Sequence, residues 1–167
     1  MDEVPKQAEW QQWLDKYAPK FLLFARQQTR CEPDAQDLVQ EALVEATQRL
    51  DVDRPPPLAL VFATIRRRAI DLARREARRS GRELVSSTQA TEPWFDTGVE
   101  ERERAKLIQE AMSKLPEIYR EAITLKIWGG LTFAEIGVTV GVPANTAASR
   151  YRYGVEELRK ITKEVLT

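Results

Sequence analysis

Residues 129–153 read GGLTFAEIGVTVGVPANTAASRYRY and decide the fold of the C-terminal part of the chain. Thr132 and Glu135 stand three positions apart, the spacing of a capping box that opens a helix. Gly141 suits a turn, because glycine adopts a positive φ at little cost, and Pro143 suits the first turn of the following helix. The stretch therefore predicts a helix-turn-helix, in which a short scaffold helix precedes a recognition helix.

The second helix of this motif has an apolar face and a polar face. Its apolar residues recur at steps of three or four, with one gap of seven, and are expected to pack inward: Ala147, Tyr151, Leu158, Ile161 and Val165. The opposite face carries Asn145, Ser149 and Arg152, residue types that reach base edges and phosphates in a DNA major groove. A polar face alone favours a solvated helix. Together with the capping box and the glycine turn, it favours DNA binding.

The composition excludes several classes of protein. The 167 residues include no histidine and one cysteine, Cys31, so ligands for a zinc site are almost absent and no internal disulfide can form. Glycine-rich phosphate loops are missing, and no apolar run reaches the roughly 18 residues of a membrane span. The polar N-terminus does not resemble a secretory signal. We therefore expect a cytoplasmic binding protein with no catalytic activity, cofactor, metal or membrane attachment.

Opposite charges occupy different segments of the chain, although Lys+Arg and Asp+Glu are both 26. Residues 60–82 carry eight arginines against Asp71 and Glu76, whereas acidic residues outnumber basic ones in residues 1–50 and 83–118. A compact basic segment between acidic flanks predicts a local site for a polyanion. The alternative is a basic, solvated helix that only aids solubility.

Helical periodicity extends over nearly the whole sequence and predicts an all-α fold. Pro19 is expected to break or restart the first helix, and the later helices are predicted at residues 34–50, 58–79, 100–114 and 117–128. Residues 80–98 are rich in Ser, Thr, Gly and Pro and indicate a linker. We therefore predict two small helical domains, joined by a flexible linker, with the helix-turn-helix in the second. Their bounds are 1–82 and 100–167, with the linker at 83–99.

Taken together, the two halves resemble the sigma-70 family of RNA polymerase subunits, in its extracytoplasmic-function (ECF) group. The stretch LPEIYREAITLKIWGGLTFAEIGVTVGVPANTAASRYRYGVEELRK, residues 115–160, is similar to region 4 of that family. The stretches DAQDLVQEALVEATQRL, residues 34–50, and FATIRRRAIDLARREARR, residues 62–79, are similar to region 2. Two motifs in the correct order and spacing make this resemblance more specific than either motif alone.

The resemblance implies a subunit that binds core RNA polymerase and directs it to promoters. The C-terminal domain would read the minus-35 element as duplex DNA, and the N-terminal domain would capture the non-template strand of the minus-10 element. The implied minus-35 residues are Asn145, Thr146, Ala148, Ser149, Arg150, Arg152 and Tyr153. The implied single-strand residues are Phe62 as a stacking ring and Arg66, Arg67, Arg68, Arg74 and Arg75 for charge.

The resemblance also implies protein partners. Residues Asp37, Leu38, Gln40 and Glu41 would contact the clamp helices of the polymerase, although an ordinary amphipathic helix is the alternative reading. Leu125, Ile127 and Trp128 are candidates for docking the polymerase flap, and a buried core role is equally consistent with each. An anti-sigma factor is a further candidate partner.

Several positions depart from the pattern of the family. Arg67 stands where the family often has Asn, and Ala148 stands where a basic residue is common. Ala147 and Gly137 replace larger residues, so we expect looser packing of the motif. Within the linker, Trp94 and Phe95 are expected to be covered from water. Docking onto this protein is the first interpretation, and entry into the polymerase cleft is the alternative.

Two other functions remain open at this point. A stand-alone helix-turn-helix regulator would bind an operator without polymerase, but it gives no role to the arginine-rich helix or to residues 34–50. A nuclease working through carboxylates would need clustered acids that hold a divalent metal. Asp71 and Glu76, near the basic segment, are five positions apart and are expected to pair with arginine instead.

Overall fold

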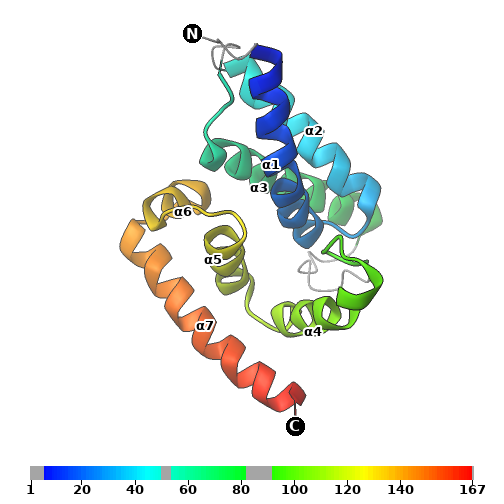
Figure 1. Ribbon diagram of the computed structural model, residues 1–167, viewed down its shortest axis with the longest axis vertical. Helices are drawn as coiled ribbons and strands as arrows, with labels where there is room; N and C mark the ends of the chain where they lie inside the picture. Colours follow the sequence, from blue (N-terminus) through cyan, green and yellow to red (C-terminus); the bar gives the residue numbers. More distant parts are fainter. Residues whose placement is uncertain (1–5, 50–53, 82–91, 167) are drawn as a thin grey trace.

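The computed structural model describes residues 6–49, 54–81 and 92–166, and in these ranges the chain is helical without a strand (Figure 1). The predicted all-α class is therefore confirmed. The N-terminal half contains α1 (Lys6–Gln28), α2 (Glu32–Arg49) and α3 (Leu58–Ser80). The C-terminal half contains a 3-10 turn, η2 (Val99–Glu101), followed by α4 (Arg102–Ser113), α5 (Glu117–Ile127), α6 (Phe133–Val140) and α7 (Ala144–Leu166).

An aromatic cluster holds the N-terminal half together. The ring of Phe62 in α3 meets the rings of Phe21 and Phe24 in α1 edge-on, with centroids 5.0 and 5.5 Å apart. Edge-to-face aromatic pairs add favourable contact energy to the burial of their apolar surface. Ala35, Leu38 and other small or aliphatic residues of α2 complete this core.

The prediction that Pro19 interrupts the first helix was wrong, because α1 is continuous from Lys6 to Gln28 with Pro19 inside it. Proline removes one backbone hydrogen bond and strains the preceding turn. Packing on both sides of Pro19 offsets that cost: Trp13 lies 5.5 Å from Phe21 and 5.8 Å from Tyr17, between ring centroids. The aromatic contacts of α1 therefore continue from one side of Pro19 to the other and hold the helix together there.

The helix-turn-helix has the geometry that its sequence predicts. The Thr132 hydroxyl accepts a hydrogen bond from the Glu135 N–H, and the Thr132 N–H donates to the Glu135 carboxylate, both at 3.1 Å. Gly141 ends α6 with a φ of 79°, the left-handed conformation that favours glycine. The expected looser packing was wrong, because a Cβ on Gly137 would lie 2.5 Å from the Val142 carbonyl oxygen. At this position only glycine lets the two helices approach so closely.

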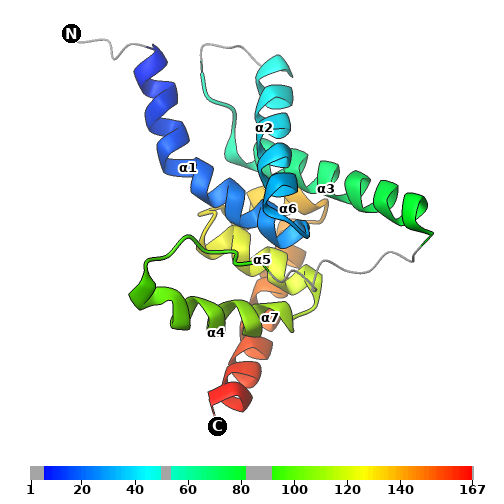
Figure 2. The same ribbon diagram turned by 90° about the vertical axis from the view of Figure 1, so that its right-hand side faces the viewer.

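The two halves pack directly against each other, an arrangement that the sequence did not predict. Helix α3 lies on α6, and the views in Figures 1 and 2 agree on this contact. Leu125, Leu131 and Ile136 of the C-terminal half join the same apolar cluster as Phe62. The boundaries predicted at 82 and 100 stay a prediction, since residues 82–91 lie outside the described ranges.

Polar contacts accompany this packing of the halves. The Thr124 hydroxyl donates to the Gln27 side-chain oxygen at 3.0 Å, and both residues are buried. The Thr139 hydroxyl lies 3.4 Å from the Ala59 carbonyl oxygen. An interface with buried polar pairs costs less to expose to water than a wholly apolar one, since water can replace those hydrogen bonds.

Candidate nucleic-acid interface

The arginines in the middle of α3 are held by two acids of α2. Arg67 donates to the Glu45 carboxylate, and Arg68 donates to Glu45 at 2.8 Å and to Glu41 at 2.9 Å. The hydrogen bonds from Arg67 and Arg68 lower the pKa of Glu45 below its ordinary value. Arg67 and Arg68 are therefore held against α2 while remaining partly exposed.

The arginines of the last turns of α3 face water. Arg74, Arg75 and Arg78 are exposed, and Arg79 pairs with Glu76 at 2.9 Å on the same helix. The pairing predicted for Glu76 is thus confirmed. Because exposed guanidinium groups on one helix produce a concentrated positive potential, this end of α3 can hold phosphates.

Two members of the predicted single-strand and polymerase sets are buried. Phe62 is 1% exposed in the aromatic core, so its predicted role as a stacking ring was wrong. Phe21 and Phe24, which cover it, belong to its own half, so separating the halves would still leave the ring enclosed. Leu38 is 4% exposed, and its predicted contact with the polymerase was wrong for the same reason.

The sequence does not predict the ion-pair partner of Arg66. Its Nε donates to both carboxylate oxygens of Glu121 in α5, at 3.2 and 3.1 Å. Glu121 itself is buried. The structure therefore turns one predicted DNA-binding arginine toward the other half of the chain. Neither Glu121 nor Glu45 was anticipated as a partner, because nothing local in the sequence connects them to α3.

The outer face of α2 remains open. Asp37, Gln40 and Glu41 are exposed, whereas Ala35 and Ala42 face the core. Within the described part of the chain, Glu41 is the member of this predicted set that has an arginine partner, Arg68. The face thus presents both carboxylate and amide groups to a partner.

The predicted recognition face lies at the first turns of α7. Asn145, Arg152 and Tyr153 are exposed, and the Arg152 guanidinium lies 5.2 Å from the centroid of the Tyr153 ring. The remaining predicted residues are partly exposed: Thr146, Ala148, Ser149 and Arg150. Ala147 is fully buried, as its place on the apolar face predicts. Tyr151, Leu158 and Ile161 pack partly buried, and the side chain of Val165 lies outside the description.

Comparison with known proteins assigns both halves. Residues 13–79 match the family model for Sigma-70 region 2, and residues 105–158 match the model for Sigma-70, region 4. The ECF RNA polymerase sigma factor SigL of Mycobacterium tuberculosis is 31% identical over 156 residues, which cover 90% of this chain and 87% of SigL. The chain belongs to the ECF RNA polymerase sigma factors. Its function is to direct core RNA polymerase in transcription initiation, and the stand-alone regulator is not favoured.

Other relatives agree with this assignment of the sigma factor. The ECF sigma factor RpoE of Cereibacter sphaeroides is 25% identical over 157 residues, which cover 92% of this chain and 86% of RpoE. A solved structure of the sigma factor RpoE from Bartonella quintana, in complex with the anti-sigma factor NepR, has the same fold. Its TM-score is 0.68 at 23% identity, and the match covers 92% of this chain and 96% of that one.

The candidate flap-binding residues of the sigma factor divide between core and surface. Leu125 is fully buried, whereas Ile127 is exposed and Trp128 packs on Phe95, with ring centroids 5.5 Å apart. The described part of the chain has no cluster of acids, histidines or cysteines suited to a metal ion. Nor does any helix within it have the length and apolar character needed to cross a membrane.

Proposed function

We propose that this sigma factor divides promoter recognition between its halves, with α3 holding single-stranded minus-10 DNA and α7 reading duplex minus-35 DNA. The outer face of α2, at Asp37, Gln40 and Glu41, binds the polymerase clamp helices. Ile127 and Trp128 remain candidates for the flap. The protein acts by binding alone, in the cytoplasm, and catalyses no reaction.

The arginines of α3 support the minus-10 assignment. Arg74 and Arg75 are exposed at one end of the helix, and Arg67 and Arg68 extend the same charge toward α2. Captured single strands require positive charge along the backbone path. Arg66 joins this set once its contact with Glu121 is released. Opening DNA costs about 1–2 kcal/mol per base-pair step, so melting is expected to need the polymerase as well.

The exposed face of α7 carries the minus-35 assignment, and it is the single observation on which the proposal most depends. Asn145 and Arg152 extend from a helix whose opposite face is packed, and the capping box and Gly141 fix its angle to α6. That arrangement leaves the first turns of a recognition helix free to enter a major groove. Arg150 is partly covered and is assigned to phosphate contact rather than to a base.

An anti-sigma factor is proposed as a regulatory partner. The Bartonella quintana sigma factor of the same fold is bound to its anti-sigma factor NepR. The likeness of fold supports the proposal for this chain, and copurification from the native source would test it.

Transcription in vitro tests the proposed function. Core RNA polymerase, the sigma factor and genomic DNA are incubated, and the 5′ ends of the transcripts are sequenced. Defined start points that require the sigma factor support the proposal, and a shared motif at minus-10 and minus-35 extends it. Tight duplex binding by the protein alone, unchanged by core polymerase, would instead support a stand-alone regulator.

A double variant separates a role in melting the minus-10 element from a role in holding the opened strand. If Arg74 and Arg75 assist melting itself, Arg74→Ala with Arg75→Ala weakens initiation more on duplex promoters than on promoters with a pre-opened minus-10 bubble. Equal loss on both templates indicates that they hold the strand after opening. Arg104→Ala removes an exposed arginine of α4, outside both proposed DNA-binding surfaces, and serves as the control.

A further inference from the structure

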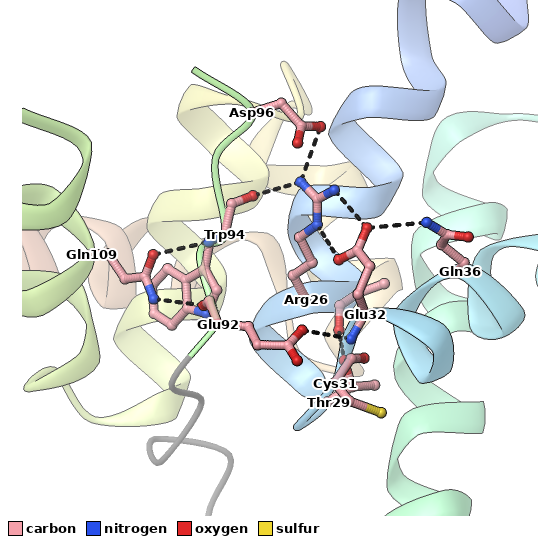
Figure 3. Close-up of polar contacts among 10 residues, drawn as sticks. Arg26, Thr29, Cys31, Glu32, Gln36, Glu92, Trp94, Asp96 and Gln109 are labelled. Atoms are coloured by element: carbon pink, nitrogen blue, oxygen red, sulfur yellow. Dashed lines mark hydrogen bonds and ion pairs between the residues drawn. The ribbon is translucent and has the colours of Figure 1, made fainter. Parts of the chain in front are cut away.

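Residues 92–96 connect both halves through one set of contacts, which we call the linker clasp: Glu92, Trp94 and Asp96 with Arg26, Glu32 and Gln109 (Figure 3). Arg26 and Glu32 belong to the N-terminal half, and Gln109 belongs to α4 of the C-terminal half. We propose that the linker clasp is an autoinhibitory contact, which keeps the sigma factor closed and which must be released before both promoter elements can be bound.

Trp94 is the apolar anchor of the linker clasp. It is 1% exposed and lies in a cluster with Leu23 of α1 and with Met112, Leu115 and Ile123 of the C-terminal half. The predicted docking of Trp94 onto this protein is therefore confirmed. Because the cluster takes residues from both halves, moving the halves apart would expose part of the indole to water.

The backbone of Trp94 is held from two sides. Its N–H donates to the Gln109 side-chain oxygen at 2.9 Å, and its carbonyl oxygen accepts from Arg26 Nη1 at 2.9 Å. Gln109 also donates to the Glu92 carbonyl oxygen at 3.0 Å. The linker thus lies between α1 and α4 and bonds to each, as Figure 3 shows.

Arg26 is the charged centre of the linker clasp. Its Nε and Nη2 donate to the two oxygens of Glu32, each at 2.7 Å, and its Nη1 also lies 3.1 Å from the Asp96 carboxylate. Paired hydrogen bonds between a guanidinium and a carboxylate are among the stronger polar contacts in proteins. Hydrogen bonding to Arg26 lowers the pKa of Glu32 below its ordinary value.

Glu92 caps the N-terminus of α2, although it lies 60 positions from Glu32 in the sequence. Its carboxylate accepts a hydrogen bond from the Glu32 N–H, the first residue of α2, at 2.7 Å. The first N–H groups of a helix lack partners within the helix, and an acidic group there is favoured by the helix dipole. Docking of the linker therefore stabilises α2, the helix that carries the proposed polymerase-binding face.

The closed arrangement is incompatible with reading both promoter elements at once. Their designations, minus-35 and minus-10, place the elements about 25 base pairs apart, which is about 85 Å at roughly 3.4 Å per base pair. Helices α3 and α6 are in direct contact in the closed chain. Arg66 is also engaged by Glu121, which removes one arginine from the proposed single-strand site. The halves must therefore separate for the proposed function, on which this inference rests.

One feature of the linker clasp favours its release. The indole Nε1–H of Trp94 is buried without a hydrogen-bond acceptor among the described residues. A buried donor that lacks a partner is unfavourable compared with the same donor in water. The docked state is therefore held by its other contacts and can be displaced by a partner that takes them.

Two single substitutions test the inference without altering the linker itself. Arg26→Gln removes the charged centre from the N-terminal side, and Gln109→Ala removes the two hydrogen bonds from the C-terminal side. Val99→Ala, a truncation of an exposed apolar residue close to the linker clasp, is the control. Circular dichroism first establishes that each variant keeps its helix content, so that a failure to fold in one variant leaves the other to decide.

The first measurement uses the free protein. Small-angle X-ray scattering should give a larger radius of gyration for Arg26→Gln and Gln109→Ala than for the wild type and Val99→Ala. An unchanged radius of gyration in both folded variants would overturn the linker clasp.

The second measurement uses equilibrium binding of the complex of core RNA polymerase and sigma factor to a promoter fragment that carries both elements. An apparent affinity is reduced by the fraction of chains in the competent state, so loosening the linker clasp should tighten promoter binding, by up to about tenfold. Unchanged or weaker binding by the expanded variants would overturn the autoinhibitory role. If the wild type does not bind the polymerase at all, the proposed function fails, and the scattering alone decides the linker clasp.

Discussion

Arg66 of α3 and Glu121 of α5 form an ion pair across the two halves of this sigma factor, with the Arg66 Nε 3.1 Å from the nearer carboxylate oxygen. The Glu121 side chain is 3% exposed, whereas the Arg66 side chain keeps contact with water. A carboxylate buried to this extent depends on its partner, since an isolated buried charge is very unfavourable. The pair therefore links the closure of the halves to the ionisation of Glu121.

The first prediction concerns the pH dependence of stability. Burial raises the pKa of Glu121 above its ordinary value of 4.5, although the charge of Arg66 opposes this shift. Between 4.5 and the raised pKa, the folded chain holds a proton that the unfolded chain has released. The free energy of unfolding should therefore fall as the pH rises through this window. Urea unfolding at a series of pH values measures it.

Glu121→Gln should make that decline smaller, because the variant has no proton to lose. Glu103→Gln, on the exposed face of α4, is the control. Glu32 and Glu45 do not interfere, since their pKa values are lowered and the stability that they contribute is lost only as the pH falls below about 4.5. Equal slopes for the wild type and Glu121→Gln would show that Glu121 is not the group that titrates.

The second prediction concerns minus-35 recognition. Arg152→Ala should weaken discrimination between the correct and an altered minus-35 element by about 1–3 kcal/mol, the range for a good base contact. Binding of the holoenzyme to a series of single-base promoter variants measures this discrimination. A uniform loss on all sequences would assign Arg152 to phosphate contact only, and Arg104→Ala, at an exposed position of α4, is the matched arginine control.

The third prediction concerns the polymerase-binding face of α2. Asp37→Arg should lower the affinity for core polymerase by roughly tenfold or more, because it reverses a charge at a proposed interface. The fold should be intact, since Asp37 is exposed. Asp15→Arg makes the same change at an exposed position of α1 and should bind normally. Wild-type assembly by Asp37→Arg would remove Asp37 from the interface.

The fourth prediction concerns the close approach inside the helix-turn-helix. Gly137→Ala should destabilise the protein by about 1–3 kcal/mol, the usual cost of overpacking, because its Cβ would lie 2.5 Å from the Val142 carbonyl oxygen. Gly98→Ala is the control, since nothing lies within 4 Å of its Cβ and its φ is −66°. Thermal unfolding of both variants measures the difference. Equal melting temperatures would indicate that the turn relaxes around the methyl group.

The sequence by itself determined the features that depend on neighbours three or four positions apart. The capping box of Thr132 and Glu135, the turn at Gly141 and the burial of Ala147 all follow from helical spacing, and all are present. The need for Trp94 to leave water could also be read from the sequence, because a large ring in a polar stretch must find cover.

Only the tertiary structure decided which charged and aromatic residues remain available to a partner. Arg66 meets Glu121 across 55 positions, Arg26 meets Asp96 across 70, and Phe62 is closed in by α1. No local pattern encodes such pairs, because their energy is gained only after distant helices have come together. Periodicity therefore gave the helices and their faces, whereas the packing of α3 on α6 determined which of those faces stay open.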